Sequence, residues 1–149
     1  MIQGRADARV AVVSALTVSV PVRWGDLDAY GHVNNVAVLG LLEQARVQAF
    51  WAEKEPVLPP LAASAPVQVV VADAQVSYRR AIPYVQAVDV TLTVPSVGGA
   101  SFVIAYEIIV GGQVAVTATT TLAVVDAATW RPMRLDRAQR DRLKQFAPT

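Results

Sequence analysis

The sequence contains no cysteine and a single histidine, His32. Without cysteine the chain can form no disulfide, no thiolate nucleophile and no cysteine-based zinc site. Nothing therefore indicates an oxidising compartment, and a cytoplasmic location is the expectation. One histidine cannot build a metal cluster by itself, so we expect no metal site and no bound cofactor.

Charged residues are also scarce, at 17% of the chain, and the 13 basic side chains almost balance the 12 acidic ones. The resulting net charge of +1 provides no field that would attract nucleic acid, so no nucleic-acid partner is expected. The chain has neither a Gly-x-Ser-x-Gly elbow nor a glycine-rich phosphate loop. Serine-triad hydrolysis and nucleotide-driven chemistry therefore have no support in the sequence.

Apolar residues, in contrast, are abundant: they make up 54% of the 149 residues, and the mean hydropathy is +0.38. This composition excludes disorder and favours one domain whose surplus apolar surface is buried in a homo-oligomer. The longest uncharged stretch, residues 108–125, is almost long enough to cross a bilayer, but Gly111-Gly112 divides it and threonines interrupt its second half. We interpret it as two strands and expect no membrane span.

Alternation of apolar and polar residues predicts five strands. The first covers Leu16 to Trp24, where apolar residues alternate with threonine, serine, proline and arginine. Four later runs carry their larger apolar groups at even-numbered positions, over residues 70–78, 88–94, 102–110 and 114–124. The first two of these later runs are each expected to have one wet face.

One long helix is predicted between the first and second strands. Asn34 or Asn35 is its candidate cap, and good helix formers without proline continue to about Glu53. No charge occurs from residue 33 to residue 42, so the helix is expected to be buried nearly all round. Gly40 in its interior is expected to allow another backbone to come close.

A second, basic helix is predicted from about residue 136 to residue 146, with Asp136 as its cap. Between the long helix and the second strand, four prolines in residues 56–66 predict an irregular surface connector. The order is therefore strand, long helix, then four strands joined by short turns. This order favours the α+β class, with an antiparallel sheet curling around one helix.

Residues 26–35 form the only segment in which acids, a histidine, amides and a glycine converge, in the pattern Asp26-x-Asp28-x-x-Gly31-His32-Val33-Asn34-Asn35. An ionised aspartate can act as a general base or attack a carbonyl directly. The following helix supplies free backbone N–H groups that can stabilise charge on a carbonyl oxygen. The segment therefore indicates acyl transfer, while a purely structural role in turns and caps stays open.

The same segment partly matches a calcium-binding loop, but the match fails at two ligand positions. Tyr30 stands at the fifth position, and Ala37 stands at the twelfth, where a bidentate glutamate is needed. Glu43 is a rival acid, but it lies eight residues beyond Asn35, which is about 12 Å along a helix. We expect Glu43 to pair with Arg46 or to make a contact across a subunit boundary.

Basic and aromatic residues offer further candidate contacts. Arg79-Arg80 or the basic tail beyond residue 130 could bind the phosphates of a carrier such as coenzyme A, although a solvated face is the favoured alternative for these charges. Trp24, Tyr30 and Trp51 could line an acyl slot, although core packing is the commoner use of such residues.

The stretch Val22–Asn35, followed by Leu42-Glu43-Gln44-Ala45-Arg46 on the helix, resembles the signature region of acyl-CoA thioesterases of the hotdog fold, in the 4-hydroxybenzoyl-CoA thioesterase-like branch. Tyr78-Arg79-Arg80 and the element order over about residues 16–126 extend the resemblance. It implies a single domain over residues 1–149, in which an antiparallel sheet of about five strands wraps one long central helix. It also implies a homodimer whose two sheets join, or a homotetramer.

The resemblance further implies hydrolysis of an acyl- or aroyl-CoA, or of an acyl carrier protein thioester. Asp28 then corresponds to the catalytic carboxylate, as nucleophile or general base, and the oxyanion N–H falls near Asn35. His32 is an assisting candidate, and Asn34 and Tyr30 are candidate substrate-binding residues. Two alternatives are a non-enzymatic acyl-CoA-binding module with the same shell and an enoyl-CoA hydratase of a related fold, whose Asp/His pair would be Asp28 and His32.

Overall fold

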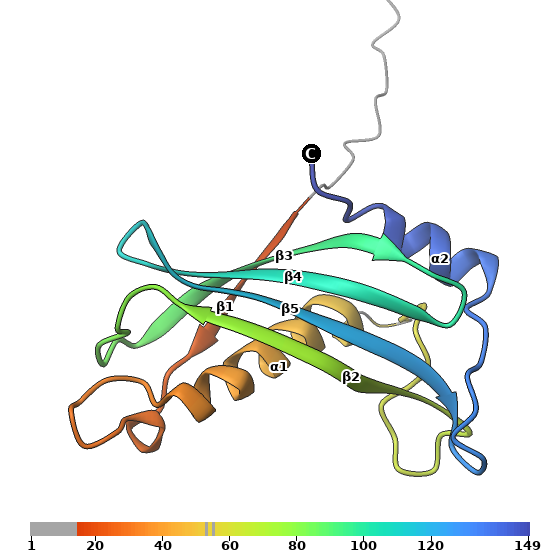
Figure 1. The fold of residues 1–149 in the computed structure, drawn as a ribbon, viewed down its shortest axis with the longest axis horizontal. Coiled ribbons are helices and arrows are strands. Elements are labelled where there is room, and N and C mark those ends of the chain that lie inside the picture. The colour runs from red at the N-terminus through yellow and green to blue at the C-terminus, as the bar shows by residue number, and fades with distance from the viewer. Residues whose placement is uncertain (1–14, 53, 55) are drawn as a thin grey trace, which may run out of the picture.

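The computed structural model describes residues 15–52, 54 and 56–149, and it contains one five-stranded antiparallel sheet with two helices (Figure 1). The strand order is β1-β3-β4-β5-β2. The elements in chain order are β1 (Leu16–Pro21), the 3-10 helix η1 (Trp24–Asp26), α1 (Asn35–Trp51), β2 (Val67–Tyr78), β3 (Ala87–Val97), β4 (Ser101–Val110), β5 (Gln113–Asp126) and α2 (Arg137–Lys144). The predicted α+β class and element order are confirmed, and the arrangement is that of the hotdog fold.

The first fourteen residues of the predicted domain and Glu53 of the predicted helix lie outside the described residues. Among the described residues no helix is long and apolar enough to cross a membrane. The predicted second helix is confirmed: Asp136 caps α2 by accepting a hydrogen bond from Gln139 N (2.8 Å).

The inner face of the sheet packs on α1 and forms the core. The even-numbered residues from Val88 to Val94 in β3 and from Phe102 to Ile108 in β4 are buried, as their alternation predicts, because each points to the same face of the pleated sheet. Helix α1 packs against β1 and β3 from this side. The buried residues of the helix are Val38, Leu41, Leu42, Ala45, Ala49 and Phe50.

The opposite face of α1 is exposed, so the prediction of all-round burial is wrong for the single chain. Val36 is 70% exposed and Leu39 44% exposed, because the sheet covers only one side of the 17-residue helix. Gly40 also lies on the uncovered side. Among the described residues no other part of the chain comes within 4 Å of the position of a Cβ on Gly40, so the expected close backbone approach is not made within this chain.

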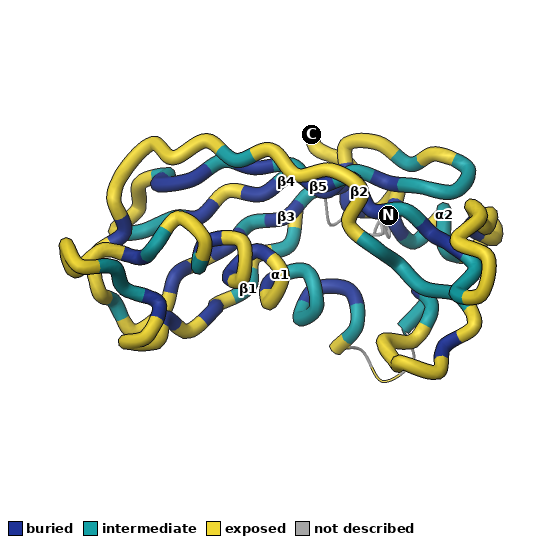
Figure 2. Tube along the Cα trace, turned by 60° about the horizontal axis from the view of Figure 1, so that its bottom comes forward, coloured by how far each residue is buried: buried dark blue, intermediate teal, exposed yellow. Residues whose placement is uncertain are grey.

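Strand β2 departs from the predicted alternation. Val71 pairs with Leu122 and Asp73 pairs with Thr121, so Ala72 is an extra residue in a β-bulge. Because a bulge reverses the side-chain alternation, the odd-numbered Val67 and Val69 pack against the core before it and the even-numbered Val76 after it, and the predicted even-numbered face holds only from Ala74 onward. Strand β2 is also an edge of the sheet and is exposed along much of its length, so its expected dry face is only partly covered in the single chain, at Val67, Val69 and Val76 (Figure 2).

One polar cluster lies inside the core, between α1 and the sheet. The hydroxyl groups of Tyr106 and Thr120 are hydrogen-bonded at 2.7 Å, and both residues are buried. Burial raises the pKa of the Tyr106 phenol, while the bond to Thr120 and the nearby Arg46 guanidinium oppose the rise. The tyrosine therefore stays neutral, and its hydrogen bond to a second hydroxyl satisfies the buried polar group.

Candidate active site

The loop between β1 and α1 is closed on itself by backbone hydrogen bonds. Asp28 N donates to His32 O (2.7 Å), and Gly31 N donates to Asp28 O (3.1 Å). Gly31 has a φ of +77°, a left-handed conformation that glycine adopts without steric cost. Leu27 and Val33 pair at the base of the loop. Asp28 is thus held on a short, tied turn immediately before the helix.

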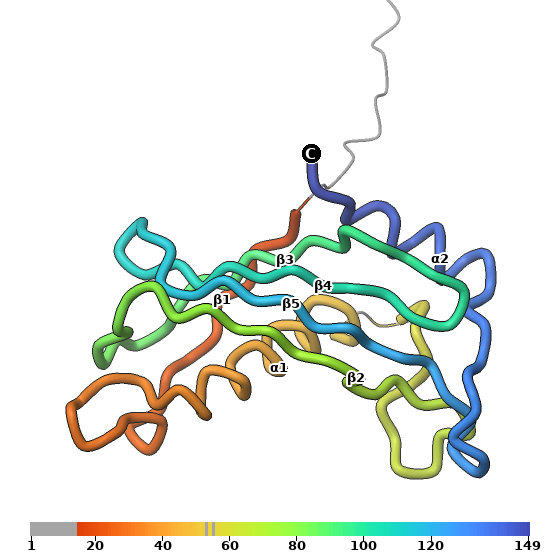
Figure 3. The backbone as a smooth tube through the Cα atoms, in the orientation of Figure 1, coloured from red at the N-terminus to blue at the C-terminus, as the bar shows by residue number. Residues whose placement is uncertain are grey.

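A second loop, between β2 and β3, fastens this turn to the sheet. Val33 N donates to Ile82 O (2.8 Å), and His32 forms an isolated bridge with Pro83. Figure 3 shows both loops at the same end of the molecule, far from α2. Residues about fifty positions apart in the chain therefore meet around the candidate catalytic aspartate.

The Asp28 carboxylate is oriented by the backbone of its own turn. Its Oδ1 accepts hydrogen bonds from Tyr30 N (2.8 Å) and His32 N (3.2 Å). No described residue donates a hydrogen bond to Oδ2. One oxygen of the carboxylate is thus fixed, and the other is free to meet water or a carbonyl carbon.

The neighbouring acid, Asp26, is used differently. It is only 7% exposed, and its two carboxylate oxygens accept from Arg23 N (2.8 Å) and from the Arg23 guanidinium (3.2 Å). Its carbonyl oxygen also accepts from Asn34 N (2.8 Å). Asp26 therefore links Arg23, before η1, to Asn34, after the turn, and both of its carboxylate oxygens already accept hydrogen bonds.

The start of α1 presents a free N–H group next to this turn. Asn34 is the N-cap, and its Oδ1 accepts from Val36 N (2.8 Å). No described residue accepts a hydrogen bond from Asn35 N, as expected for the first residue of a helix. The Asn35 carbonyl oxygen accepts from the Tyr78 hydroxyl (2.9 Å), which ties the first helical turn to the end of β2.

Replacing Asn34 by alanine is expected to lower the free energy of unfolding by about 1 kcal/mol, because Val36 N loses its acceptor. Asn34→Asp keeps an acceptor oxygen and should retain nearly all of the stability. Urea unfolding of the two variants and the wild type measures the difference. Equal stability of Asn34→Ala and the wild type would show that the cap contributes nothing to α1.

A cavity of about 330 Å³ opens beside the turn and the helix start. The structure brings three of the predicted residues, Asp28, His32 and Asn35, together in its wall. The side chain of Asn34 serves as the cap, and Tyr30 is 86% exposed; neither residue lines the cavity. The other described lining residues are Val33, Val38, Tyr78, Arg79, Arg80, Ala81, Ile82 and Val116.

Three groups of these lining residues were not predicted from the sequence as site residues. Tyr78 contacts the start of α1 through its hydroxyl group. The signal that could have indicated a site role for Tyr78 is its position as the last residue of β2. Val38 and Val116 form apolar walls, and their periodicity indicates only that they face inward. Ala81 and Ile82 lie in a loop whose contact with the catalytic turn has no local sequence signal.

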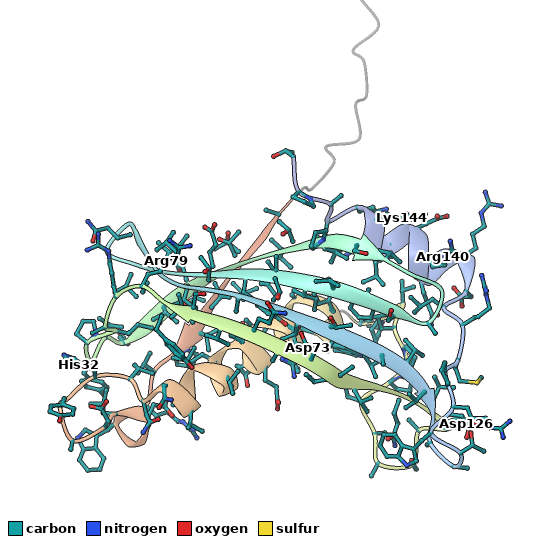
Figure 4. All side chains as sticks on the ribbon, viewed as in Figure 1. His32, Asp73, Arg79, Asp126, Arg140 and Lys144 are labelled. Atoms are coloured by element: carbon teal, nitrogen blue, oxygen red, sulfur yellow. The ribbon has the colours of Figure 1, made fainter. Side chains whose placement is uncertain are left out.

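Two arginines at the end of β2, Arg79 and Arg80, also line this cavity. Both backbone N–H groups donate to Ala115 O (2.8 and 3.0 Å), which fixes the end of β2 against β5. Arg79 Nε also donates to Thr117 Oγ1 (3.4 Å). Figure 4 shows Arg79 at the same end of the molecule as His32, whereas Arg140 and Lys144 lie at the other end.

Glu43, the rival acid, forms the predicted pair with Arg46 at 3.4 Å. It does not line the cavity beside Asp28. A larger cavity, of about 500 Å³, lies on the outer face of the sheet among threonine, serine and alanine side chains. Within the described ranges no three histidine, aspartate or glutamate residues are grouped as metal ligands would be.

Both the sequence and the fold match known proteins. The model of the thioesterase-like superfamily matches residues 22–143. The chain is similar to a thioesterase from Thermus thermophilus solved with coenzyme A and Zn, with 30% identity, coverage of 86% of this chain and 96% of that chain, and a TM-score of 0.73. It is also similar to the DHNA-CoA thioesterase from Staphylococcus aureus, with 24% identity, coverage of 89% and 88%, and a TM-score of 0.75. No curated protein matches. The family match spans every residue around the Asp28 cavity.

Proposed function

The chain belongs to the thioesterase-like superfamily and is a thioester hydrolase, and from this premise we propose that it cleaves acyl-CoA or aroyl-CoA thioesters at the Asp28 cavity. The observation that carries the proposal is the shared cavity wall of Asp28, Asn35, Arg79 and Arg80. It combines a free carboxylate oxygen, a free helix N–H group and two cations. These are the groups that a charged thioester substrate requires.

Asp28 is the proposed catalytic carboxylate. With its Oδ1 held by two backbone N–H groups, Oδ2 can accept a proton from water while the water oxygen attacks the thioester carbon. Alternatively, Oδ2 attacks the carbon itself, and water then hydrolyses the resulting anhydride. In both routes the carbon–sulfur bond breaks, and the thiolate of coenzyme A takes up a proton.

Asn35 N–H is the proposed oxyanion donor. It is the first free amide of α1, where the partial positive charge of the helix also stabilises an anion. Negative charge collects on the carbonyl oxygen in either route, so this donor contributes most in the transition state. His32 is proposed to assist Asp28. Asn34 and Tyr30 are proposed to contribute to substrate binding indirectly: Asn34 caps the start of α1, and Tyr30 N holds the Asp28 carboxylate.

Arg79 and Arg80 are expected to bind the phosphates of coenzyme A. Removal of either guanidinium group should raise KM for an acyl-CoA about tenfold, because a charge-assisted hydrogen bond contributes about 1.5 kcal/mol. The same acyl group on N-acetylcysteamine, which has no phosphate, should show an unchanged KM. Arg137→Ala, on α2, is the matched control. Equal effects on both substrates would contradict the phosphate role.

Release of free thiol from a panel of acyl-CoA and aroyl-CoA substrates tests the proposal. We expect turnover of at least one substrate class in the panel. We also propose that the active protein is a homo-oligomer and that it is located in the cytoplasm. If acyl-CoA raised the melting temperature and no thiol appeared, the site would bind without hydrolysis, because a ligand that binds only the native state stabilises it.

A further inference from the structure

Tyr78, the last residue of β2, reaches from the edge of the sheet to the start of α1. It lines the Asp28 cavity, and its hydroxyl group donates to the carbonyl oxygen of Asn35 (2.9 Å). Strand β2 forms one edge of the sheet, whereas α1 packs against β1, at the other edge, and against β3 beside it. The Tyr78 hydroxyl group therefore links two elements that the strand order places apart.

The backbone that carries Tyr78 is fixed to the sheet. Tyr78 pairs with Val116 of β5, and the next two residues both donate their backbone N–H groups to Ala115 O (2.8 and 3.0 Å). A tyrosine side chain also has few torsion angles, so it loses little conformational entropy when it is held. The hydroxyl group of Tyr78 is therefore presented to the helix from a fixed base.

The same end of the sheet also holds the turn of the proposed catalytic carboxylate. Val33 N donates to Ile82 O (2.8 Å), and His32 forms its bridge with Pro83. Both partners lie in the loop that directly follows β2. The catalytic turn and the residue with the proposed oxyanion N–H group are thus both attached to one short segment, residues 78–83.

We infer that Tyr78 is a positioning residue, whose hydroxyl group sets the place of Asn35 N–H relative to the Asp28 carboxylate. The inference rests on the proposed function, in which these two groups act on one thioester carbonyl. The N–H and C=O groups of Asn35 are joined through a single Cα, so holding the carbonyl restricts rotation of the whole residue. A displacement of about 1 Å at a reacting group can lower a rate about 10²-fold, so loss of this hold should affect the chemical step.

The stability of the fold should depend much less on this hydroxyl group. Tyr78 is 50% exposed, so water can replace the lost hydrogen bond. The Asn35 carbonyl oxygen also accepts from the helical N–H group four residues later, so it keeps a partner when the tyrosine hydroxyl group is removed. Tyr78→Phe should therefore fold normally, with a helix start that is less restrained.

Tyr78→Phe tests the inference because it removes a single oxygen atom. For the acyl-CoA that the wild type hydrolyses best, kcat should fall about tenfold and KM should stay within about twofold, because an oxyanion donor acts in the transition state. Tyr84→Phe is the matched control. It removes the same atom from the β2–β3 loop, where Tyr84 is 57% exposed and does not line the cavity, so kcat should be that of the wild type.

A double-mutant cycle with Asn35→Pro distinguishes positioning from a direct contact with the substrate. Proline at this position has no N–H group to be positioned, so adding Tyr78→Phe should not lower kcat further. Hydrogen exchange measures the same coupling without activity. The amide of Leu39, whose helical acceptor is the Asn35 carbonyl, should exchange faster in Tyr78→Phe than in the wild type or in Tyr84→Phe.

The outcomes separate the positioning role from the proposed function. Wild-type kcat in Tyr78→Phe would overturn the positioning role, and so would a higher KM with unchanged kcat, which would make Tyr78 a binding residue. A further tenfold loss in the Asn35→Pro background, or unchanged exchange at Leu39, would also overturn it. No hydrolysis of any acyl-CoA by the wild type would instead overturn the proposed function.

Discussion

Replacing Asp28 by asparagine is expected to lower the rate of thioester hydrolysis by about 10³-fold. Asparagine keeps an oxygen that can accept from Tyr30 N and His32 N, so the turn should retain its conformation. What it lacks is the charged oxygen that accepts a proton or attacks the carbon. Single-turnover thiol release at saturating substrate measures the chemical step directly.

Asp26→Asn is the matched control for this prediction. It changes the same atoms two residues away, but Asp26 is bound to Arg23 and does not line the Asp28 cavity. We expect a lower melting temperature and a catalytic rate within a few-fold of the wild type. A folded Asp28→Asn protein with nearly normal turnover would remove Asp28 from the mechanism.

Replacing Asn35 by proline is expected to lower kcat by about 10²-fold to 10³-fold, which is the effect of losing one oxyanion donor. Proline has no N–H group, and it is favoured at the first position of a helix. The preceding residue, Asn34, has φ −61° and ψ 140°, a conformation that a residue before proline adopts readily. The variant should therefore lose the donor and keep the helix.

Asn35→Ala separates the contribution of the backbone N–H group to kcat from that of the side chain. It removes the side-chain amide and keeps the N–H group, so kcat should fall much less than in Asn35→Pro. Circular dichroism and the melting temperature establish whether α1 survives in both variants. Equal kcat values for Asn35→Pro and the wild type would show that the oxyanion is stabilised elsewhere.

Local signals in the sequence predicted the elements that form the site. Alternation located the strands, and Asn34 with the following apolar run placed the start of α1 correctly, because capping depends on neighbouring residues only. The i,i+3 pair of Glu43 with Arg46 was also predictable from helix geometry. The family resemblance, and not spacing, selected Asp28 over Asp26.

Features that depend on distant partners were not predictable in this way. The bulge at Ala72 arises from the register of β2 against β5, which no local pattern of β2 reveals. The cavity wall needs the contact of His32 with Pro83, across about fifty residues of chain. The exposed face of α1 is also not predictable from the helix sequence. An apolar helix sequence indicates that the helix is covered, but it does not indicate whether the covering residues belong to the same chain.

A crystal structure of Asp28→Asn with a bound acyl-CoA tests the central claim most directly, because it shows whether one carbonyl meets both proposed groups. We expect the carbonyl oxygen about 3 Å from Asn35 N and the carbonyl carbon about 3 to 3.5 Å from the side chain of residue 28. A thioester bound in the outer-face cavity, or with its carbonyl oxygen turned away from Asn35 N, would contradict the proposed mechanism.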